Sequence, residues 1–380
     1  MRSYDCVVIG LGAMGSAALR EMALRGHEVL GVDAFHPPHD RGSSHGESRI
    51  IRKAYFEDPA YVPLVLRSYE AWAALERVSG KTLLHRCGGL FAGFPESEVV
   101  QGSLASARDH ELPHELLETV DIRNRYPQFS PPEGVVAVYE PDAGFLRVEA
   151  CIETLLDQAV RHGAETLFHH RLTRWERHGD LFHLAVGDRR IETPHLLVTA
   201  GAWLGKLLPD MAAQVTVQQV MTAWFPTQDA GASFRVDRFP VHIWDLDDGA
   251  LCYGMPRVPG GRPGIKLGFH GHRATVDPDH RPDTAAETAG ELGHYGRKLI
   301  PALIPEPVDA ATCMYTTTAD HHFIVGPHPE QPGVWLAGGF SGHGFKFAPV
   351  IGAIAADLVA SGTTAHPIAP FSPSRQKLST

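Results

Sequence analysis

"YDCVVIGLGAMGSAALREMALRGHEVLGVD", residues 4–33, is the stretch that decides the fold. It opens with a short apolar run rich in valine and isoleucine, which is typical of a buried parallel strand. A glycine turn follows, with Gly10, Gly12 and Gly15 in a G-x-G-x-x-G pattern, and then a helical stretch closed by another glycine. A second apolar run ends at Asp33. Strand, glycine turn, helix and strand in this order predict a dinucleotide-binding unit.

Each part of such a turn has a physical task. Gly10 allows the tight turn, Gly12 lets the backbone approach a pyrophosphate, and Gly15 lets the helix pack closely on the strand. The free amides at the start of the helix suit phosphate groups, and Asp33 can accept hydrogen bonds from ribose hydroxyls. FAD and NAD both satisfy this pattern, and a glycine-rich turn in another α/β fold is the alternative.

Further nucleotide-domain patterns recur along the chain. Residues 150–165 read as an amphipathic helix, 194–203 as an apolar strand, and 333–361 as a strand, a glycine turn and a helix. Between them, residues 214–275 alternate aromatic and β-branched side chains, which indicates antiparallel sheet. A simple NAD dehydrogenase more often keeps its nucleotide unit contiguous, so this interleaving favours FAD.

The predicted fold class is therefore α/β, with a discontinuous Rossmann-like FAD-binding domain and an α+β substrate domain whose sheet is mainly antiparallel. A length of 380 residues also exceeds what one core usually holds. The predicted FAD-binding domain comprises residues 1–85, 146–215 and 311–380, and the predicted substrate and catalytic domain comprises residues 86–145 and 216–310.

Composition limits the class of partner. The formal net charge of −10 argues against a nucleic-acid or anionic-membrane surface, because those partners need a positive field. The five cysteines have no paired spacing, which is typical of a reducing compartment. No apolar run reaches the length that a membrane span needs, and the nucleotide pattern begins by residue 5, with no room for a signal peptide before it. A cytoplasmic protein is expected.

Three polar stretches are unusual for mere packing. "RGSSHGESRIIRK" holds Arg49 and Arg52 three residues apart, on one face if this segment is helical, near His45. Lys266 lies inside an otherwise apolar strand pattern, four residues before His270. A lysine there is costly unless it is paired or has a task.

The third stretch, "GGFSGHGFKF", places His343 and Lys346 in a glycine-rich turn before the last helix. For any one of these cations the alternative is a surface side chain whose stem lies along apolar surface. The three stretches together favour a binding or catalytic site. The 23 histidines form no metal-ligand pattern, and no G-x-S-x-G motif indicates a hydrolase, so no metal is expected.

Cys313 lies in "ATCMYTTTAD", residues 311–320, a strand-like run of threonines. From the residues alone it could be a small buried hydrophobe, a nucleophile, a metal ligand or a point of covalent attachment. The answer depends on what the rest of the chain binds.

The chain resembles the monomeric sarcosine oxidase family of flavoproteins, which includes N-methyltryptophan oxidase and pipecolate oxidase. The resemblance covers essentially the whole length. The segments that carry it are "GLGAMG" with Asp33, "GSSHGESRIIRKAY", "YEPDAGFLR", "TAGAW", "YGMP", "KLGFH", "CMYTTTAD" and "GFSGHGFKFAP". The most specific of these are "SHGESRIIR", the C-M-Y-T segment and "SGHGFKF".

This resemblance implies a role for each polar stretch. Cys313 would bond covalently to the flavin, Lys266 would promote reduction of oxygen, and Arg52 with Lys346 would bind the substrate carboxylate. The cofactor-binding residues would be Gly10, Gly12, Gly15, Asp33, Ser43, His45, Arg49, Cys313, Gly342, His343, Gly344 and Lys346. The catalytic residues would be Lys266, His270, Arg49, Tyr253 and Tyr315.

The implied reaction is oxidation of a secondary amino acid by hydride transfer to flavin N5, with sarcosine, oxygen and water giving glycine, formaldehyde and hydrogen peroxide. The amine must bind in its neutral form, because an ammonium has no lone pair to support hydride loss. Positive charge on Arg49 and His270 would lower the pKa of the bound amine. Tyr253 and Tyr315 could close a small pocket, which favours sarcosine over a bulky indole.

Other readings stay open at this point. The substrate could be N-methyl-L-tryptophan or another N-methyl or cyclic amino acid. An NAD-linked dehydrogenase is a second enzyme class, and a catalytically silent flavin-binding protein is a non-enzymatic one. The expected partners are a small amino-acid substrate and oxygen, and the expected state is a monomer.

Overall fold

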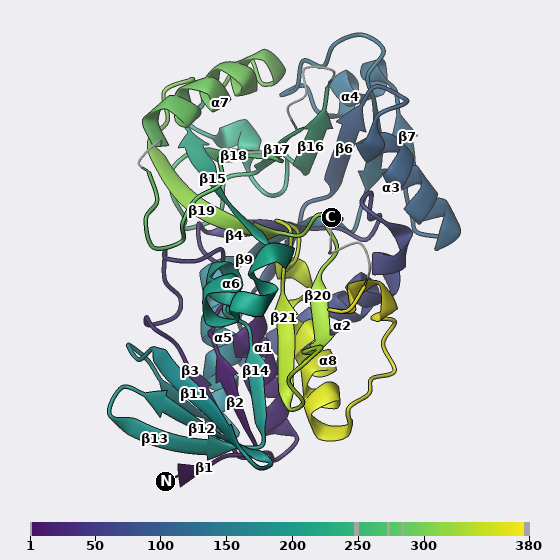
Figure 1. Ribbon diagram of the computed structural model, residues 1–380. Coiled ribbons are helices and arrows are strands. Elements are labelled where there is room, and N and C mark those ends of the chain that lie inside the picture. The colour runs from purple at the N-terminus through teal and green to yellow at the C-terminus, as the bar shows by residue number, and fades with distance from the viewer. Residues whose placement is uncertain (1, 247–250, 272–273, 283–284, 376–380) are drawn as a thin grey trace.

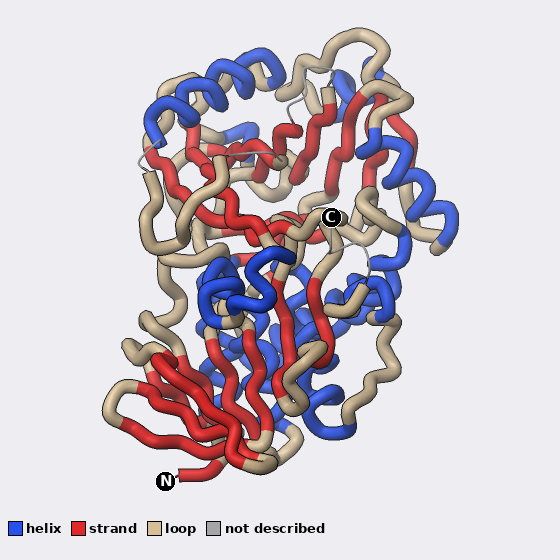
Figure 2. Tube along the Cα trace, viewed as in Figure 1, coloured by secondary structure: helices blue, strands red, loops and turns tan. Residues whose placement is uncertain are grey.

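The computed structural model describes residues 2–246, 251–271, 274–282 and 285–375. They form two stacked parts, each built around one large sheet (Figure 1). The lower part of Figure 1 holds a six-stranded sheet and the upper part an eight-stranded one. Helices pack beside the strands in both parts (Figure 2).

The six-stranded sheet confirms the predicted nucleotide-binding architecture. Across the sheet its strands are β10 (Glu165–Leu167), β3 (Val29–Val32), β2 (Cys6–Ile9), β14 (His195–Val198), β21 (Val334–Gly338) and β20 (Ile324–Pro327). All neighbours are parallel except β20 and β21. Segments from three distant parts of the sequence therefore share one sheet.

Layers on both faces explain why these strands are apolar throughout. From β2, Cys6 and Val8 pack into a core with the helices, while Val7 and Ile9 pack into a second core on the opposite face. The helices are α1 (Ala13–Leu24), α2 (Val62–Ser79), α5 (Val148–Arg161) and α8 (Ala348–Ser361). The second core is closed by a four-stranded sheet of β1 (Arg2–Ser3), β13 (Arg189–Thr193), β12 (Leu181–Val186) and β11 (Leu172–His178), and by α6 (Leu204–Leu207). A strand buried on both faces cannot alternate polar and apolar residues.

The eight-stranded sheet confirms the predicted mainly antiparallel second sheet. Its order is β19 (Asp309–Thr317), β15 (Thr216–Phe225), β18 (Ile265–His270), β17 (Leu251–Met255), β16 (Val241–Asp245), β6 (Gly89–Gly93), β8 (Val136–Glu140) and β7 (Glu115–Leu117). Only β16 and β6 are parallel. Helices α4 (Thr119–Arg125) and α7 (Ala285–Leu299) pack on one face, and α3 (Glu98–Asp109) packs on the other.

A short three-stranded sheet contains the segment with Arg49 and Arg52. It consists of β4 (Ser48–Ile51), β9 (Gly144–Arg147) and β5 (Leu84–Arg86). The helical interpretation of this segment is wrong, because Ser48–Ile51 pairs antiparallel with Gly144–Arg147. Its two adjacent isoleucines favour a strand. Arg49 lies in β4 and Arg52 directly follows this strand, so the two arginines do not share a helical face.

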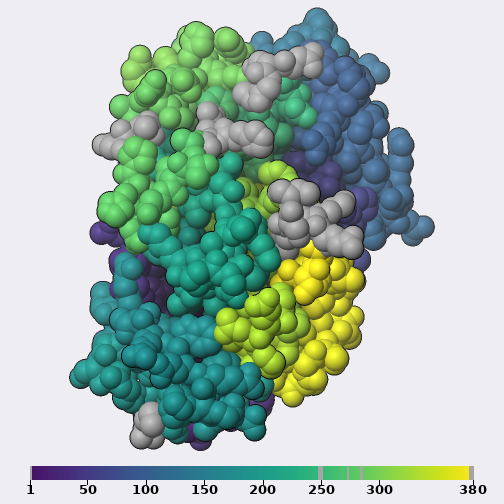
Figure 3. All heavy atoms as spheres, in the orientation of Figure 1, coloured from purple at the N-terminus to yellow at the C-terminus, as the bar shows by residue number. Residues whose placement is uncertain are grey.

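The predicted domain boundary at residue 311 falls inside β19. This strand pairs with β15 along its whole length, so the segment with Cys313 lies at the edge of the eight-stranded sheet. The C-terminal elements then return to the lower part, where yellow C-terminal atoms lie below the green and blue upper part (Figure 3). Among the helices of the described residues, none is long and apolar enough to cross a membrane.

Candidate active site

A cavity of about 400 Å³ joins the two parts. One end is lined by Gly10, Gly12 and Asp33 at the carboxyl ends of the parallel strands, where ligands of open α/β sheets usually bind. The other end reaches the eight-stranded sheet and is lined by residues from widely separated segments. These residues include Arg49, Arg52, Glu57, Tyr253, His270, Tyr315, His343 and Lys346.

The glycine turn is built as the sequence predicts. Gly10 has a φ of 93°, a conformation that favours glycine, and a Cβ there would lie 2.7 Å from the carbonyl oxygen of Thr199. At Gly15 a Cβ would lie only 1.8 Å from the carbonyl oxygen of Gly10. The first helix thus approaches the strand so closely that no side chain fits between them.

The same end fits a dinucleotide. At Gly12 an added Cβ would meet only the Ser44 hydroxyl, at 3.6 Å, so backbone is open to the cavity. Gly12 caps α1 without a side-chain hydrogen bond, and the Ala13 amide reaches the Ser44 hydroxyl only at 3.4 Å, so the start of the helix suits an anionic ligand. Asp33 accepts bonds from the amides of Leu11 and Phe35 at 2.7 and 2.8 Å and still faces the cavity.

Replacing Gly15 with alanine tests this cradle. The added methyl group collides with backbone that a side-chain rotation cannot move, so we expect a loss of stability of about 1–3 kcal/mol or more and a fall in bound FAD. Thermal melting and the FAD absorbance of purified protein measure both. Gly290→Ala is the matched control, because nothing lies within 4 Å of that position in α7. A Gly15→Ala protein with normal stability and full FAD would contradict the close approach.

Cys313 lies in a cationic environment. The thiol is buried, and the Arg49 guanidinium donates to its sulfur at 3.4 Å. Burial alone would raise the pKa of the Cys313 thiol, but Arg49, His45 and Lys266 outweigh it and lower that pKa to about 6. Arg49 is itself fixed by the carbonyl oxygens of Ser43 and Ser48, each at 2.9 Å. The thiolate is the nucleophilic form of cysteine, so this sulfur is chemically activated.

Lys266 is buried beside this group. Its ammonium donates to the carbonyl oxygens of Gly46 and Ser48 at 2.6 and 2.8 Å and lies 5.5 Å from the centre of the Trp224 ring. Burial and the Arg49 guanidinium lower the pKa of Lys266 to about 7. The lysine of the apolar strand is therefore a buried cation with two carbonyl partners, and not a surface side chain.

Arg52 and Lys346 converge at the far end of the cavity, and both are buried. Arg52 forms an ion pair with Glu57 and donates to the carbonyl oxygen of Ala54 at 2.8 Å. Burial would raise the pKa of Glu57, but Arg52 above all lowers it to about 2. Lys346 donates to the carbonyl oxygen of His343 at 2.7 Å, and burial and Arg52 lower its pKa to about 7.

His270, Tyr253 and Tyr315 line the wall between these groups. The Nδ1 atom of His270 lies 3.3 Å from the Tyr315 hydroxyl. Burial lowers the pKa of His270 to about 4, so its ring is neutral at neutral pH. The positive charge expected from His270 is therefore not supplied, and Arg49 remains as the cation on this side of the cavity.

The structure brings most of the predicted site residues to one cavity. Gly342, His343, Gly344 and Ser43 also line it, whereas Gly15, His45, Lys266 and Cys313 lie behind the lining. Sequence reasoning missed Glu57, whose carboxylate forms an ion pair with Arg52. The indication in the sequence was an acidic residue five positions after Arg52. Among the described residues, no group of three histidine, cysteine or acidic side chains could hold a metal ion.

Comparison with known proteins decides the family. The family model described as "FAD dependent oxidoreductase" matches residues 5–358. The chain belongs to the FAD-dependent oxidoreductases. FAD, and not NAD, is thus the cofactor of this oxidoreductase.

Its relatives include enzymes with named substrates. A monomeric sarcosine oxidase of Streptomyces avermitilis is 43% identical over 376 residues, which cover 98% of both chains. A monomeric sarcosine oxidase of Bacillus is 36% identical over 381 residues, 99% of this oxidoreductase and 97% of the relative. An N-methyl-L-tryptophan oxidase of Yersinia pestis is 35% identical over 356 residues, which cover 93% of this chain and 94% of that enzyme.

Solved structures share the fold of this oxidoreductase. NikD, described as an unusual amino acid oxidase of nikkomycin biosynthesis, superposes with a TM-score of 0.86 at 23% identity over 99% of both chains. The glycine oxidase of Geobacillus kaustophilus superposes with a TM-score of 0.82 at 20% identity over 99% of both chains. At these identities the likeness establishes the fold alone.

Proposed function

We propose that the protein uses oxygen to oxidise a small secondary amino acid. Sarcosine is the first candidate, and its reaction with oxygen and water gives glycine, formaldehyde and hydrogen peroxide. The observation that carries this proposal is the buried pair Arg52 and Lys346 in the cavity between the two parts. Two converging cations suit a carboxylate, which every amino-acid substrate has. The sarcosine oxidases among the relatives support the choice of sarcosine.

Bound FAD would supply the acceptor for the hydride that leaves the substrate carbon and would pass the electrons to oxygen. The protein must bind the substrate so that its amine is neutral, because only the lone pair can support loss of a hydride. The Arg49 guanidinium lines the cavity. Its charge lowers the pKa of a nearby amine and so favours the reactive form.

The covalent attachment of FAD through Cys313 is part of the proposal. Arg49 and His45 hold the sulfur in its nucleophilic state next to the cavity. The neighbouring residues Met314 and Tyr315 line the cavity, so Cys313 lies beside the cavity on the same strand. The monomeric state and the cytoplasmic location stay predictions from the sequence.

An apolar wall favours a second substrate class. Near the cations, the cavity is also lined by Ile50, Phe56, Ile243, Leu251 and Met255. Such a wall can accept an apolar side chain, as in N-methyl-L-tryptophan, the substrate named for one relative.

A panel of amines with hydrogen peroxide as the readout tests the function. The panel should contain sarcosine, N-methyl-L-alanine, N-methyl-L-tryptophan, L-pipecolate, and dimethylamine as a substrate without a carboxylate. Peroxide with sarcosine supports the proposal, and faster turnover of N-methyl-L-tryptophan would move it to the second class. Yellow protein that makes no peroxide with any N-methyl amino acid would overturn it.

Removing either cation should weaken carboxylate binding. We expect Arg52→Ala and Lys346→Ala each to lose about 1.5–3 kcal/mol of binding free energy for acetate, the range for a hydrogen bond to a charged group. Titration of the FAD absorbance spectrum with acetate measures the dissociation constants. Turnover of dimethylamine should barely respond, since that amine has no carboxylate.

Exposed cations provide the matched controls. Arg67→Ala and Lys81→Ala each remove a charge at the surface, where the side chains are 64% and 46% exposed. Both should bind acetate like the wild-type protein. If both cavity variants also keep the wild-type dissociation constant, the substrate carboxylate binds elsewhere.

A further inference from the structure

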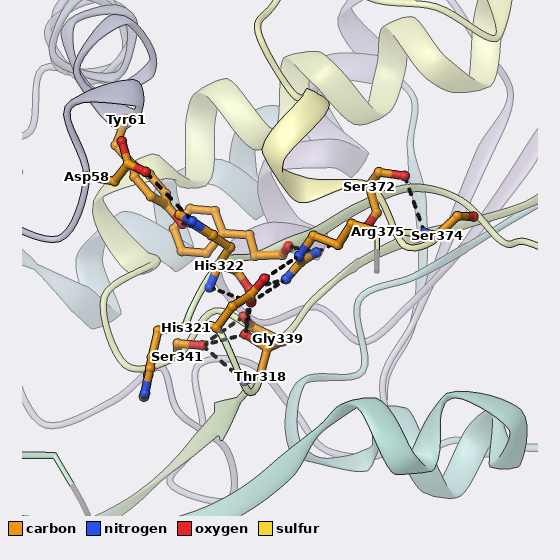
Figure 4. Close-up of polar contacts among 12 residues, drawn as sticks. Asp58, Tyr61, Thr318, His321, His322, Gly339, Ser341, Ser372, Ser374 and Arg375 are labelled. Carbon is orange, nitrogen blue, oxygen red and sulfur yellow. Dashed lines mark hydrogen bonds and ion pairs between the residues drawn. The ribbon is translucent and has the colours of Figure 1, made fainter. Parts of the chain in front are cut away.

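A partly buried arginine near the C-terminus, Arg375, contacts the loop of residues 318–323, which connects β19 and β20. The Arg375 side chain is only 12% exposed and makes a two-pronged ion pair with Asp320 (Figure 4). Its Nε and Nη2 atoms donate to the two carboxylate oxygens at 2.8 and 2.9 Å. This geometry is specific to arginine, because a lysine has a single ammonium and no planar fork.

The remaining donors of Arg375 fix the backbone of the same loop. Nη1 donates to the carbonyl oxygen of Phe323 at 2.7 Å, and Nη2 donates to that of His322 at 2.9 Å. The fully buried Phe371 anchors the segment before Arg375, with its ring 5.0 Å from Tyr61 and 5.3 Å from Phe323. The loop therefore depends on the C-terminal segment for its conformation.

One hydrogen-bonded route leads from this loop to Lys346. His321 has a φ of 59°, and its carbonyl oxygen accepts from Nε2 of His343 at 3.1 Å. Since Nε2 carries the proton, Nδ1 of His343 accepts from the Tyr55 hydroxyl at 2.6 Å. That hydroxyl lies 3.3 Å from the Lys346 ammonium, which also donates to the His343 carbonyl oxygen. The loop thus fixes the orientation of the His343 ring. That ring in turn fixes the Tyr55 hydroxyl, which contacts the Lys346 ammonium.

A second route leads toward Arg52. His322 contacts the Tyr61 hydroxyl through Nδ1 at 3.0 Å, and its Nε2 lies 3.7 Å from the Asp58 carboxylate (Figure 4). Asp58 directly follows Glu57, the ion-pair partner of Arg52. This second route reaches Arg52 only through the chain from Asp58 to Glu57, whereas the route to Lys346 is hydrogen-bonded throughout.

We propose that Arg375 is a positioning residue for Lys346 of the carboxylate-binding pair, acting through the loop of residues 318–323 and the ring of His343. Arg375 is not among the residues that line the cavity, so it touches no ligand there. Its effect is to preorganise Lys346 before substrate arrives. This inference rests on the proposed function, because it assumes that Lys346 binds a carboxylate.

Acetate titrations of Arg375→Ala and Arg375→Lys test the inference. We expect the dissociation constant of acetate to rise about tenfold in Arg375→Ala, and by less in Arg375→Lys, which keeps the charge but loses the fork. Arg25→Ala is the matched control, because it also breaks an arginine–aspartate pair, to Asp357 in α8, at a site outside the cavity lining. Thermal melting of the three variants reports stability separately from binding.

The double variant Arg375→Ala/Lys346→Ala gives the decisive measurement. If Arg375 acts through Lys346, the double variant binds acetate as weakly as Lys346→Ala alone, within about twofold. A further tenfold loss in the double variant would overturn the inference, and so would lower melting temperatures with unchanged acetate affinity.

The two failures are distinguishable. If Lys346→Ala weakens acetate binding but neither Arg375 variant does, the proposed carboxylate site is supported and the positioning role of Arg375 is wrong. If Lys346→Ala leaves the dissociation constant of acetate unchanged, both the proposed carboxylate site and this inference are wrong. Arg375→Lys keeps the test available should the alanine variant not fold.

Discussion

Replacing Lys266 with methionine is expected to slow the reaction with oxygen by about 100- to 1,000-fold, the effect of one well-placed electrostatic donor, while substrate oxidation changes little. Methionine keeps the length and apolar character of the stem and removes the buried charge together with its hydrogen bonds to the carbonyl oxygens of Gly46 and Ser48. Oxygen acquires negative charge as it is reduced, and a cation in a site of low dielectric stabilises that charge strongly. Stopped-flow measurement of the two half-reactions gives the two rate constants.

The pH dependence provides a second readout for Lys266. Because the pKa of Lys266 is lowered to about 7, the cation is present below this pH and is lost above it. The oxygen rate of the wild-type protein should therefore fall as pH rises through about 7, and that of Lys266→Met should be flat over this interval. Lys298→Met, which removes an exposed cation from α7, should behave like wild type. Equal slowing of both half-reactions would assign Lys266 to structure or substrate binding instead.

Cys313→Ala should lose all covalently bound FAD. Its thiol is the activated one, with a pKa lowered to about 6 by Arg49 and His45 against burial. Acid precipitation separates the outcomes, because covalent FAD stays in a yellow pellet and free FAD enters the supernatant. The glycine cradle is untouched, so the variant should still bind FAD reversibly before precipitation.

Two other cysteines serve as controls. Burial raises the pKa of the Cys87 thiol to about 12, so that thiol is not activated, and Cys252 is buried in the core of the eight-stranded sheet. Cys87→Ala and Cys252→Ala should both keep a yellow pellet. Flavin in the pellet of Cys313→Ala, and its loss from either control, would move the attachment point to that cysteine.

Local patterns in the sequence determined the nucleotide-binding half. The strand, glycine turn, helix and acid of residues 4–33 are contiguous, and their conformations follow from short-range sterics and hydrogen bonding. A Cβ at Gly15 would collide with the carbonyl oxygen of Gly10, five residues away, so sequence spacing alone specifies this contact. The antiparallel second sheet could also be predicted from local sequence, because the type of side chain alternates along single strands.

The segment around Arg49 shows where local reasoning failed. Arginine spacing suggested one helical face, but pairing with Gly144–Arg147, almost one hundred residues away, makes it a strand. A strand partner so distant leaves no periodic signal in a four-residue element. The family resemblance predicted that Arg52 and Lys346 act together on a carboxylate. The residues alone did not indicate that these two side chains lie close to each other.

The sequence by itself determined the dinucleotide cradle, the class of the fold and the residue types of the site. Only the tertiary structure decided the charge states: His270 is neutral, Lys266 and Lys346 have lowered pKa values, and Cys313 has a thiol that ionises readily. It also brought Glu57 to Arg52 and placed Arg375 behind the cavity. The physical reason is that a pKa depends on burial and on charges within a few ångströms, and the chain sets those distances only when remote segments pack together.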